Sequence, residues 1–191
     1  VDEILVMMAP GFLDEVRAIV KKGEYAKVTQ ILEGAETRNE TTAAALAALG
    51  DDECNVLLHD AVRPLVSQTI IAANVEALQT HEAVDTAIPS ADTVIEVEPE
   101  HNSIADVLPR HLLRRGQTPQ SFRLSTIKAA YAKAAQDPNF TATDDCTVVL
   151  RYLPEVPIAV VAGHERNMKV TEPIDVYIAD KLFQLTSADR P

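Results

Sequence analysis

One stretch, VLLHDAVRPLVS at positions 56–67, constrains the fold more than any other part of the chain. Its three apolar residues run directly into His59 and Asp60, without the alternation of a half-exposed strand. Such a run predicts a strand buried on both faces, as strands of parallel sheets usually are. Pro64 cannot donate to a strand ladder and is expected to stop the strand. An acid at the carboxyl end of such a strand lies where open α/β sheets bind ligands.

The role of Asp60 has two interpretations. Asp60 can hold a divalent metal ion on phosphate oxygens, with Arg63 facing the same negative charge. Alternatively, Asp60 caps the following helix and pairs with Arg63, and no ligand is involved. The stretch alone leaves both interpretations open.

Short apolar runs alternate with segments of helical periodicity along most of the chain. Strands are predicted at residues 4–8, 27–32, 56–60, 83–88 and 158–162, and helices at 12–22, 41–49, 69–78, 124–135, 147–152 and 172–186. Because strand–helix alternation builds a sheet covered by helices, we expect the α/β class. The predicted architecture is a three-layer α/β/α sandwich around a mostly parallel sheet.

Residues 92–107 depart from this alternation. They alternate apolar and polar residues with period two on either side of a turn at 99–102, which predicts an antiparallel hairpin. An isolated two-stranded hairpin is marginal in water, so a second copy of the chain is the expected cover. We therefore expect a homodimer, with residues 92–115 as a dimerisation arm within a single domain over 1–191. The apolar residues of the hairpin are Val94, Ile95, Val97, Ile104 and Val107.

The charge balance excludes two classes of partner. Acids outnumber bases 29 to 17, and a formal charge of −12 opposes binding to nucleic acid or to an anionic membrane. No apolar run approaches the length of a membrane span. The two cysteines, Cys54 and Cys146, show no metal or redox spacing and are expected to be reduced thiols of a cytoplasmic protein. A phosphorylated substrate would need a local basic pocket, and residues 110–115 form the most basic stretch.

A polar loop at residues 33–41 precedes the second predicted helix. Arg38 and Thr41 lie just ahead of the helix N-terminus, which favours a contact with a nucleotide. The alternative is a capped helix preceded by a solvated, charged loop.

Four segments, HDAVRP, RGQTPQSF, ATDDCTVV and NMKVTEPIDVYIADKL, resemble the sugar-alcohol-phosphate cytidylyltransferases, in the same order. The resemblance implies a Rossmann-like nucleotidyltransferase fold and an enzyme that joins CTP to a polyol phosphate, releasing pyrophosphate, with Mg²⁺ as cofactor. The run VDTAIPSADTVIEV resembles the ribitol branch, so D-ribitol 5-phosphate is the expected substrate and CDP-ribitol the expected product. The alternatives are 2-C-methyl-D-erythritol 4-phosphate and a non-catalytic nucleotide-binding or dimerisation module.

The resemblance also implies roles for individual residues. Lys169 matches a lysine near the reacting phosphates, and Asp60 would hold Mg²⁺. By position alone, Lys169 would be an exposed lysine at a strand end. Cytosine is expected near residues 34–41. The residues implied in substrate binding are Arg38, Thr41, Asp60, Ala61 and Arg63, with Thr118, Lys133 and Thr143 on the polyol phosphate, partly across a dimer.

The chain departs from the family pattern at its start. It begins at what resembles the family's second strand, and its six glycines are scattered rather than gathered in a phosphate-binding loop. We therefore expect the N-terminal strand and Gly-rich loop to be missing. The run RRGQTPQSF also resembles the cytidylyltransferase half of two-domain proteins with a C-terminal ribulose-5-phosphate reductase. A reductase domain or partner is expected on that basis.

Overall fold

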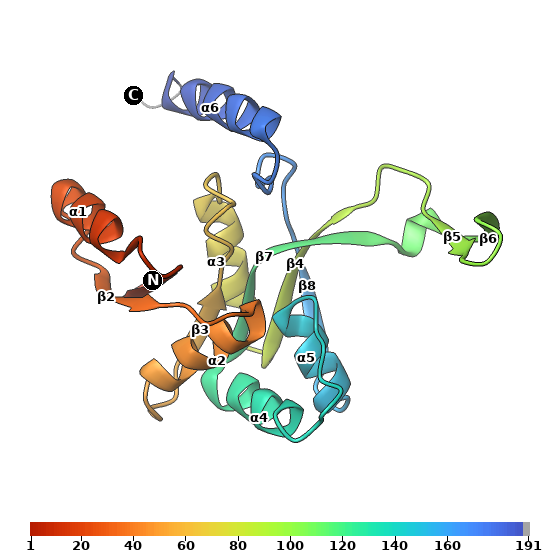
Figure 1. Cartoon of the computed structure of the whole chain (residues 1–191), viewed down its shortest axis with the longest axis horizontal. Coiled ribbons are helices and arrows are strands. Elements are labelled where there is room, and N and C mark those ends of the chain that lie inside the picture. Colours follow the sequence, from red (N-terminus) through yellow and green to blue (C-terminus); the bar gives the residue numbers. More distant parts are fainter. Residues whose placement is uncertain (189–191) are drawn as a thin grey trace. The chain divides into compact units, whose positions relative to one another are not determined.

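The computed structural model describes residues 1–188 (Figure 1). The chain divides into two compact units. The first contains residues 1–54 and 124–154, and the second contains residues 55–123 and the described part of 155–191. Each unit is therefore built from two separate stretches of the sequence.

The first unit combines a small parallel sheet with four helices. Strands β1 and β2 pair in parallel, α1 packs on β2, α2 contacts β1 and α4, and α4 packs on α5. Asp144 caps α5, because its Oδ1 accepts a hydrogen bond from the Thr147 amide at 2.7 Å. The elements are β1 (Ile4–Met8), α1 (Leu13–Gly23), β2 (Val28–Glu33), α2 (Arg38–Ala48), α4 (Leu124–Ala134) and α5 (Asp145–Tyr152).

The second unit is organised around a four-stranded sheet in the order β3-β7-β4-β8. Strand β7 is antiparallel to both β3 and β4, whereas β4 and β8 are parallel. Three of the four strands thus share one direction, but two of the three pairings are antiparallel, so this sheet is mixed rather than mostly parallel. Helix α3 packs against β4, β7 and β8. The elements are β3 (Asn55–Leu58), α3 (Gln68–Ala77), β4 (Ala83–Pro89), the 3₁₀ turn Arg110–Leu112, β7 (Arg114–Arg123), β8 (Ile158–Ala162) and α6 (Pro173–Ala188).

Strand β7 was not among the predicted strands. Its sequence, RRGQTPQSFR, contains a proline and several polar residues, yet residues 117–122 are buried. Hydrogen bonds compensate for this burial: the Thr86 hydroxyl donates to the Pro119 carbonyl at 2.7 Å, and the Ser121 hydroxyl donates to Asn74 Oδ1 at 2.8 Å. The sequence did not predict this strand because its side chains are polar. The groups that satisfy them lie far away in the sequence.

The sequence predicted a strand over residues 56–60 that is buried on both faces, and the burial was wrong. Strand β3 ends at Leu58, well before Pro64, and only Val56 of this strand is buried. The strand lies at one end of the sheet order, not between two partners. Asp60 therefore sits in the turn after β3, where the Arg63 amide donates to the Asp60 carbonyl at 2.9 Å.

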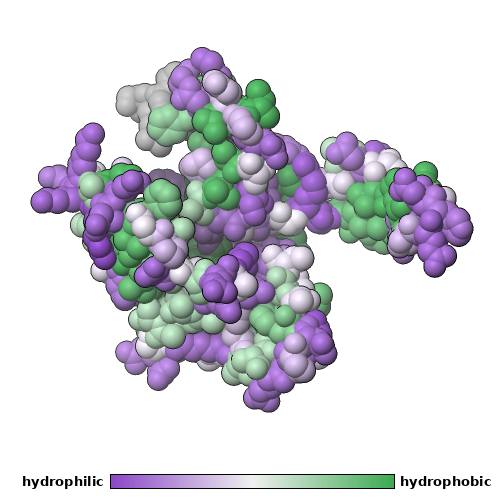
Figure 2. Space-filling model, in the orientation of Figure 1, coloured by the Kyte–Doolittle hydropathy of each residue, from purple (hydrophilic) through white to green (hydrophobic). Residues whose placement is uncertain are grey.

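The hairpin was predicted correctly. Strands β5 (Ile95–Glu98) and β6 (Ser103–Val107) are antiparallel, and every residue of β6 is exposed. Figure 1 shows the hairpin at the far end of the segments that leave β4 and return to β7. Hydrophobic residues gather on it, at the right of the view in Figure 2. Among residues 1–188, no helix is long and apolar enough to cross a membrane.

Candidate functional site

Asp60, Arg63 and Lys169 meet in the second unit. Asp60 Oδ2 lies 3.4 Å from Arg63 Nε and 3.3 Å from Lys169 Nζ. The side chains of Asp60 and Arg63 are 15% and 11% exposed, whereas that of Lys169 is 48% exposed. One carboxylate thus faces two cations, from segments more than 100 residues apart, and all three residues stand in motifs that carry the resemblance. We call this group the Asp60 cluster.

Thr118 joins the cluster from β7. Its Oγ1 accepts a hydrogen bond from the Asp60 amide at 3.0 Å and lies 2.9 Å from His59 Nδ1. The other ring nitrogen of His59, Nε2, lies 3.0 Å from the Arg63 carbonyl oxygen. The predicted residue Ala61 is exposed in the same turn. His59 was not predicted as a site residue, because a histidine before an acid carries no recognisable spacing.

Asn167 fixes the loop that carries Lys169. Its side-chain Nδ2 donates to the Thr118 carbonyl at 2.7 Å, and its own carbonyl accepts from Arg63 Nη1 at 2.8 Å. The residue is fully buried, and its Oδ1 has no hydrogen-bond partner among the described residues. The Val170 amide also donates to the Val62 carbonyl at 2.8 Å. Sequence reasoning missed Asn167, although it stands two positions before Lys169 in the motif NMKVT.

Arg38 lies in a different environment, in the first unit. Its Nη2 lies 2.7 Å from Asp145 Oδ2, and the Tyr131 hydroxyl donates to Asp145 Oδ1 at 2.6 Å. The Asp145 side chain is completely buried, while that of Arg38 is 37% exposed. Burial and the neighbouring Asp145 charge raise the pKa of Tyr131 above its ordinary value. We call Arg38, Tyr131 and Asp145 the Asp145 cluster.

Helix α2 begins earlier than predicted, at Arg38 rather than Thr41. Thr37 is the N-cap: its Oγ1 accepts from the Glu40 amide at 3.2 Å, and Glu40 Oε2 accepts from the Thr37 amide at 3.0 Å. The capped helix that the sequence left as an alternative is therefore present. Thr41 stabilises the preceding loop, because its Oγ1 accepts from the Ala35 amide at 2.9 Å.

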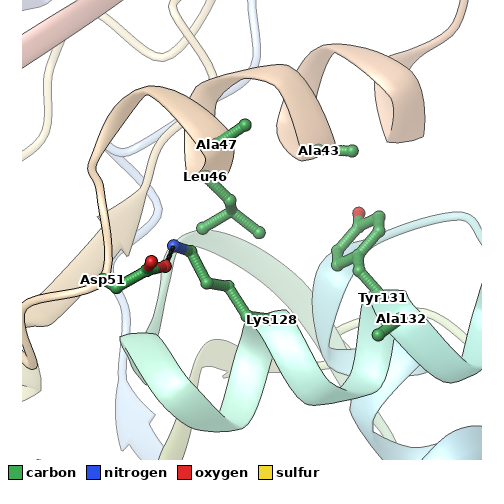
Figure 3. A pocket seen from close by; sticks show the side chains of 7 residues that line it. All are labelled: Ala43, Leu46, Ala47, Asp51, Lys128, Tyr131 and Ala132. Carbon is green, nitrogen blue, oxygen red and sulfur yellow. Dashed lines mark hydrogen bonds and ion pairs between the residues drawn. The ribbon is translucent and has the colours of Figure 1, made fainter.

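The other two predicted polyol-phosphate residues also belong to the first unit. Lys133 is exposed near the end of α4, and its Nζ donates to the Tyr152 carbonyl at 3.1 Å. Thr143 is exposed directly before the α5 cap. A separate hollow between α2 and α4 contains none of the predicted residues (Figure 3). It is lined by Ala43, Leu46, Ala47, Asp51, Lys128, Tyr131 and Ala132.

The available metal-ligating side chains determine where a divalent ion would fit. Mg²⁺ usually takes one or two carboxylates from the protein and completes its shell with substrate phosphates and water. Asp60 supplies one carboxylate beside two cations that suit phosphate, so the cluster fits Mg²⁺ only together with a phosphorylated ligand. Glu98, Glu100 and His101 are the only set of three or more metal-ligating types placed to share an ion within residues 1–188, and they lie on the exposed hairpin turn.

Comparisons with known proteins agree over nearly the whole chain. Residues 1–185 match the family described as IspD, 2-C-methyl-D-erythritol 4-phosphate cytidylyltransferase. The cytidylyltransferase of that name from Thermobifida fusca is 49% identical over 189 residues, covering 96% of this chain and 76% of the relative. A bifunctional ribulose 5-phosphate reductase/CDP-ribitol pyrophosphorylase from Haemophilus influenzae is 39% identical, covering 98% of this chain but only 40% of the relative.

A solved structure extends the likeness to three dimensions. The 4-diphosphocytidyl-2C-methyl-D-erythritol synthase of Anaerococcus prevotii superposes with a TM-score of 0.89 at 30% identity, over 96% of this chain and 82% of that one. The predicted α/β, Rossmann-like nucleotidyltransferase fold is thereby confirmed. On the family match, the sequence identities and this superposition together, the chain belongs to the 2-C-methyl-D-erythritol 4-phosphate cytidylyltransferase (IspD) family of nucleotidyltransferases.

Proposed function

We propose that the protein transfers a cytidylyl group from CTP to 2-C-methyl-D-erythritol 4-phosphate. The single observation that carries this choice is the 49% identity to the Thermobifida fusca enzyme of that name. The sequence favoured D-ribitol 5-phosphate, but the CDP-ribitol relative is more distant, at 39% identity. D-Ribitol 5-phosphate therefore becomes the second candidate, supported by the match of that relative to 98% of this chain.

The Asp60 cluster supports this chemistry through its charges. An oxygen of the polyol phosphate attacks the α-phosphorus of CTP, and pyrophosphate leaves. Because negative charge is spread over the oxygens around phosphorus, the protein contributes mainly position and positive charge. Arg63 and Lys169, which both contact Asp60 Oδ2, would supply that charge. Asp60 would hold Mg²⁺, which neutralises phosphate charge when bound.

The proposal also covers the residues that the resemblance assigns to the second substrate. Thr118, Lys133 and Thr143 would bind the polyol phosphate, partly across a dimer. Arg38 and Thr41 would order the loop at residues 34–41 around the cytosine, because each is already bonded to its surroundings. A cytoplasmic location stays a proposal, since the two cysteines, Cys54 and Cys146, have no metal or redox spacing. A reductase domain or partner remains a proposal that follows the Haemophilus relative's name.

The substrate is tested by measuring pyrophosphate release by the full-length protein with CTP and Mg²⁺. We expect a higher kcat/KM with 2-C-methyl-D-erythritol 4-phosphate than with D-ribitol 5-phosphate. The reverse order would make the ribitol enzyme the correct assignment. No release with either compound would favour the non-catalytic alternative.

We also propose that the hairpin mediates a homodimer. Ile104 is 63% exposed and Val107 is 53% exposed, which is more apolar surface than a lone ribbon should present to water. Light scattering on the full-length protein should give the mass of a dimer, and Ile104→Asp should give a monomer. Leu150→Asp, at a residue 65% exposed on α5, is the matched control and should stay dimeric. A monomeric unmodified protein at micromolar concentration would refute the arm.

A further inference from the structure

The segment at residues 163–169 runs from the end of β8 to Lys169, and we call it the Lys169 loop. Two amide side chains join this loop to β7. Gln117 stands on β7 and bonds to the loop, whereas Asn167 stands in the loop and bonds to β7. Gln117 is 5% exposed and Asn167 is fully buried, so water does not compete for these bonds. We call the two residues the amide clamp.

The backbone partners fix the direction of each hydrogen bond. The His164 amide can only donate and lies 3.2 Å from Gln117 Oε1, while the His164 carbonyl can only accept and lies 3.0 Å from Gln117 Nε2. In the same way, the Asn167 atom 2.7 Å from the Thr118 carbonyl oxygen must be the donor Nδ2. This Nδ2 also donates to Gln117 Oε1 at 3.3 Å. Neither amide can therefore be turned over without losing its bonds to the backbone.

Gly163 provides the space that the Gln117 side chain occupies. A Cβ atom on Gly163 would collide with Gln117 Oε1 and would lie 3.2 Å from Gln117 Cδ. Because the end of a glutamine is flexible, a side chain at this position would displace the amide rather than the backbone. At Gly116, by contrast, an added Cβ would lie 3.9 Å from Asp85 Oδ2, an ordinary contact. The clamp can thus be disturbed from Gly163, and Gly116 offers the matched control.

The clamp determines where two cations of the Asp60 cluster lie. Asn167 stands two residues before Lys169, and its own carbonyl accepts from Arg63 Nη1 at 2.8 Å. On the other side of Lys169, the Val170 amide donates to the Val62 carbonyl at 2.8 Å. The backbone is therefore fixed on both flanks of Lys169, although the lysine side chain is half exposed.

We propose that Gln117 and Asn167 are positioning residues, which hold Lys169 and Arg63 in place before substrate binds. That these two cations act on phosphates rests on the proposed function, whereas the clamp itself does not. Cations that are fixed in advance stabilise developing negative charge without a cost of reorganisation during the reaction. The clamp therefore contributes to the rate through residues other than its own two.

The unpartnered Oδ1 of Asn167 offers a competing role. This buried oxygen has no hydrogen-bond partner among the described residues, and a ligand could supply one. Asn167→Asp distinguishes the two roles, because aspartate keeps an oxygen in place of Oδ1 and replaces the Nδ2 donor by a second oxygen facing the Thr118 carbonyl. Positioning through Nδ2 predicts that aspartate lowers kcat at least as much as serine does. An aspartate variant that keeps the original kcat while the serine variant loses it would overturn the proposal.

Hydrogen exchange in the full-length protein measures the clamp without turnover. Gln117→Met removes the acceptor of the His164 amide, and Asn167→Ser removes the donor that fastens the loop before Val170. We expect the exchange of the His164 amide in the first variant, and of the Val170 amide in the second, to rise about tenfold. Glu165→Gln removes only an exposed ion pair between the same loop and β7, so it should leave both rates unchanged. Unchanged rates in Gln117→Met and Asn167→Ser would refute the clamp.

Pyrophosphate release from CTP and 2-C-methyl-D-erythritol 4-phosphate measures what the clamp contributes to the rate. Gly163→Ala, Gln117→Met and Asn167→Ser should each lower kcat roughly tenfold, because small displacements of groups at a reacting centre can cost up to about 10²-fold. Gly116→Ala should keep the original kcat. In a Lys169→Met background, Asn167→Ser should lower kcat no more than about twofold, since the cation that it positions is already gone.

A general loss of folding would act differently. It would lower kcat by the same factor whether Lys169 is present or replaced, and that result would show a structural role and contradict the proposal. Gly163→Ala covers the case in which Asn167→Ser does not fold, because it disturbs the clamp by displacing only the end of one side chain. If the exchange rates change as expected but the unmodified protein releases no pyrophosphate from CTP with either polyol phosphate, only the proposed function has failed.

Discussion

Asp60 and Asp145 are both carboxylates that face a guanidinium, yet their surroundings differ. Asp145 is fully buried and receives short contacts, 2.7 Å from Arg38 and 2.6 Å from Tyr131. Asp60 is 15% exposed and receives longer contacts, 3.4 Å from Arg63 and 3.3 Å from a half-exposed Lys169. In the Asp145 cluster, the carboxylate is shielded from water by its partners. In the Asp60 cluster, two cations lie beside a carboxylate that is partly exposed.

The difference in burial and contact distance indicates that the two carboxylate–guanidinium pairs serve different purposes. A buried carboxylate that lost one partner would remain desolvated and uncompensated, so the Asp145 cluster should matter for stability. A loosely paired carboxylate can exchange its contacts for a ligand at low cost, so the Asp60 cluster should matter for activity. Each prediction below tests whether stability and activity separate in this way.

The largest effect is expected for Asp60→Asn. The change keeps the shape of the side chain but removes the charge that would hold Mg²⁺, so kcat should fall by a factor of roughly 10²–10³. Pyrophosphate release with CTP at saturating Mg²⁺ is the measurement, and circular dichroism should show an intact fold. Unchanged turnover would remove Asp60 from the metal site and leave it as a capping or pairing residue.

The second effect concerns stability and should come from Asp145→Asn. The change leaves Arg38 without its carboxylate partner; because that arginine is more than a third exposed, we expect a loss of about 2 kcal/mol rather than the full cost of a buried pair. Urea unfolding measures it. Asp137→Asn is the matched control, because Asp137 also contacts an arginine and a tyrosine but lies near the surface. An equal loss of unfolding free energy in both variants would show that burial gives the Asp145 cluster no extra importance for stability.

A third, smaller effect should change the KM for one of the two substrates and leave the other KM unchanged. Lys133→Met removes one exposed positive charge from the proposed polyol-phosphate pocket, and the KM for the polyol phosphate should rise about fivefold while the KM for CTP stays constant. Lys128→Met on the same helix removes a charge that pairs with Asp51 and should change neither KM. A rise in the KM for CTP alone would move Lys133 to the nucleotide side.

How much the sequence predicts differs between the two clusters. Resemblance singled out Asp60, Arg63, Thr118 and Lys169, because each stands in a recognisable motif, and the structure places these four residues together. Their roles stay predictions. It did not reveal the pairing of Arg38 with Asp145, since 107 residues separate them and no local pattern links the first residues of two distant helices.

The same limit applies to the fold. Most strands and helices followed from periodicity, with ends displaced by a few residues. Strand β7 did not, because its buried polar side chains are satisfied only by tertiary hydrogen bonds to residues such as Asn74 and Thr86. His59 and Asn167 were missed for a related reason: their importance lies in what they contact, which residue type and spacing do not encode.

The smallest effect should appear at alkaline pH, from Tyr131→Phe. Burial and the Asp145 charge raise the pKa of the Tyr131 hydroxyl, so the folded protein resists its ionisation, whereas the unfolded chain ionises near pH 10. The resulting stability is fully present below about pH 10 and is lost as the pH rises beyond it. At neutral pH the variant should lose about 2 kcal/mol, because the hydrogen bond that it removes is made to a buried carboxylate. Above about pH 10 its urea midpoint should fall less steeply than that of the original protein, while Tyr177→Phe, at a ring 72% exposed, should keep the original slope. If Tyr131→Phe kept that slope as well, the Asp145 cluster would be open to water, and its contrast with the Asp60 cluster would disappear.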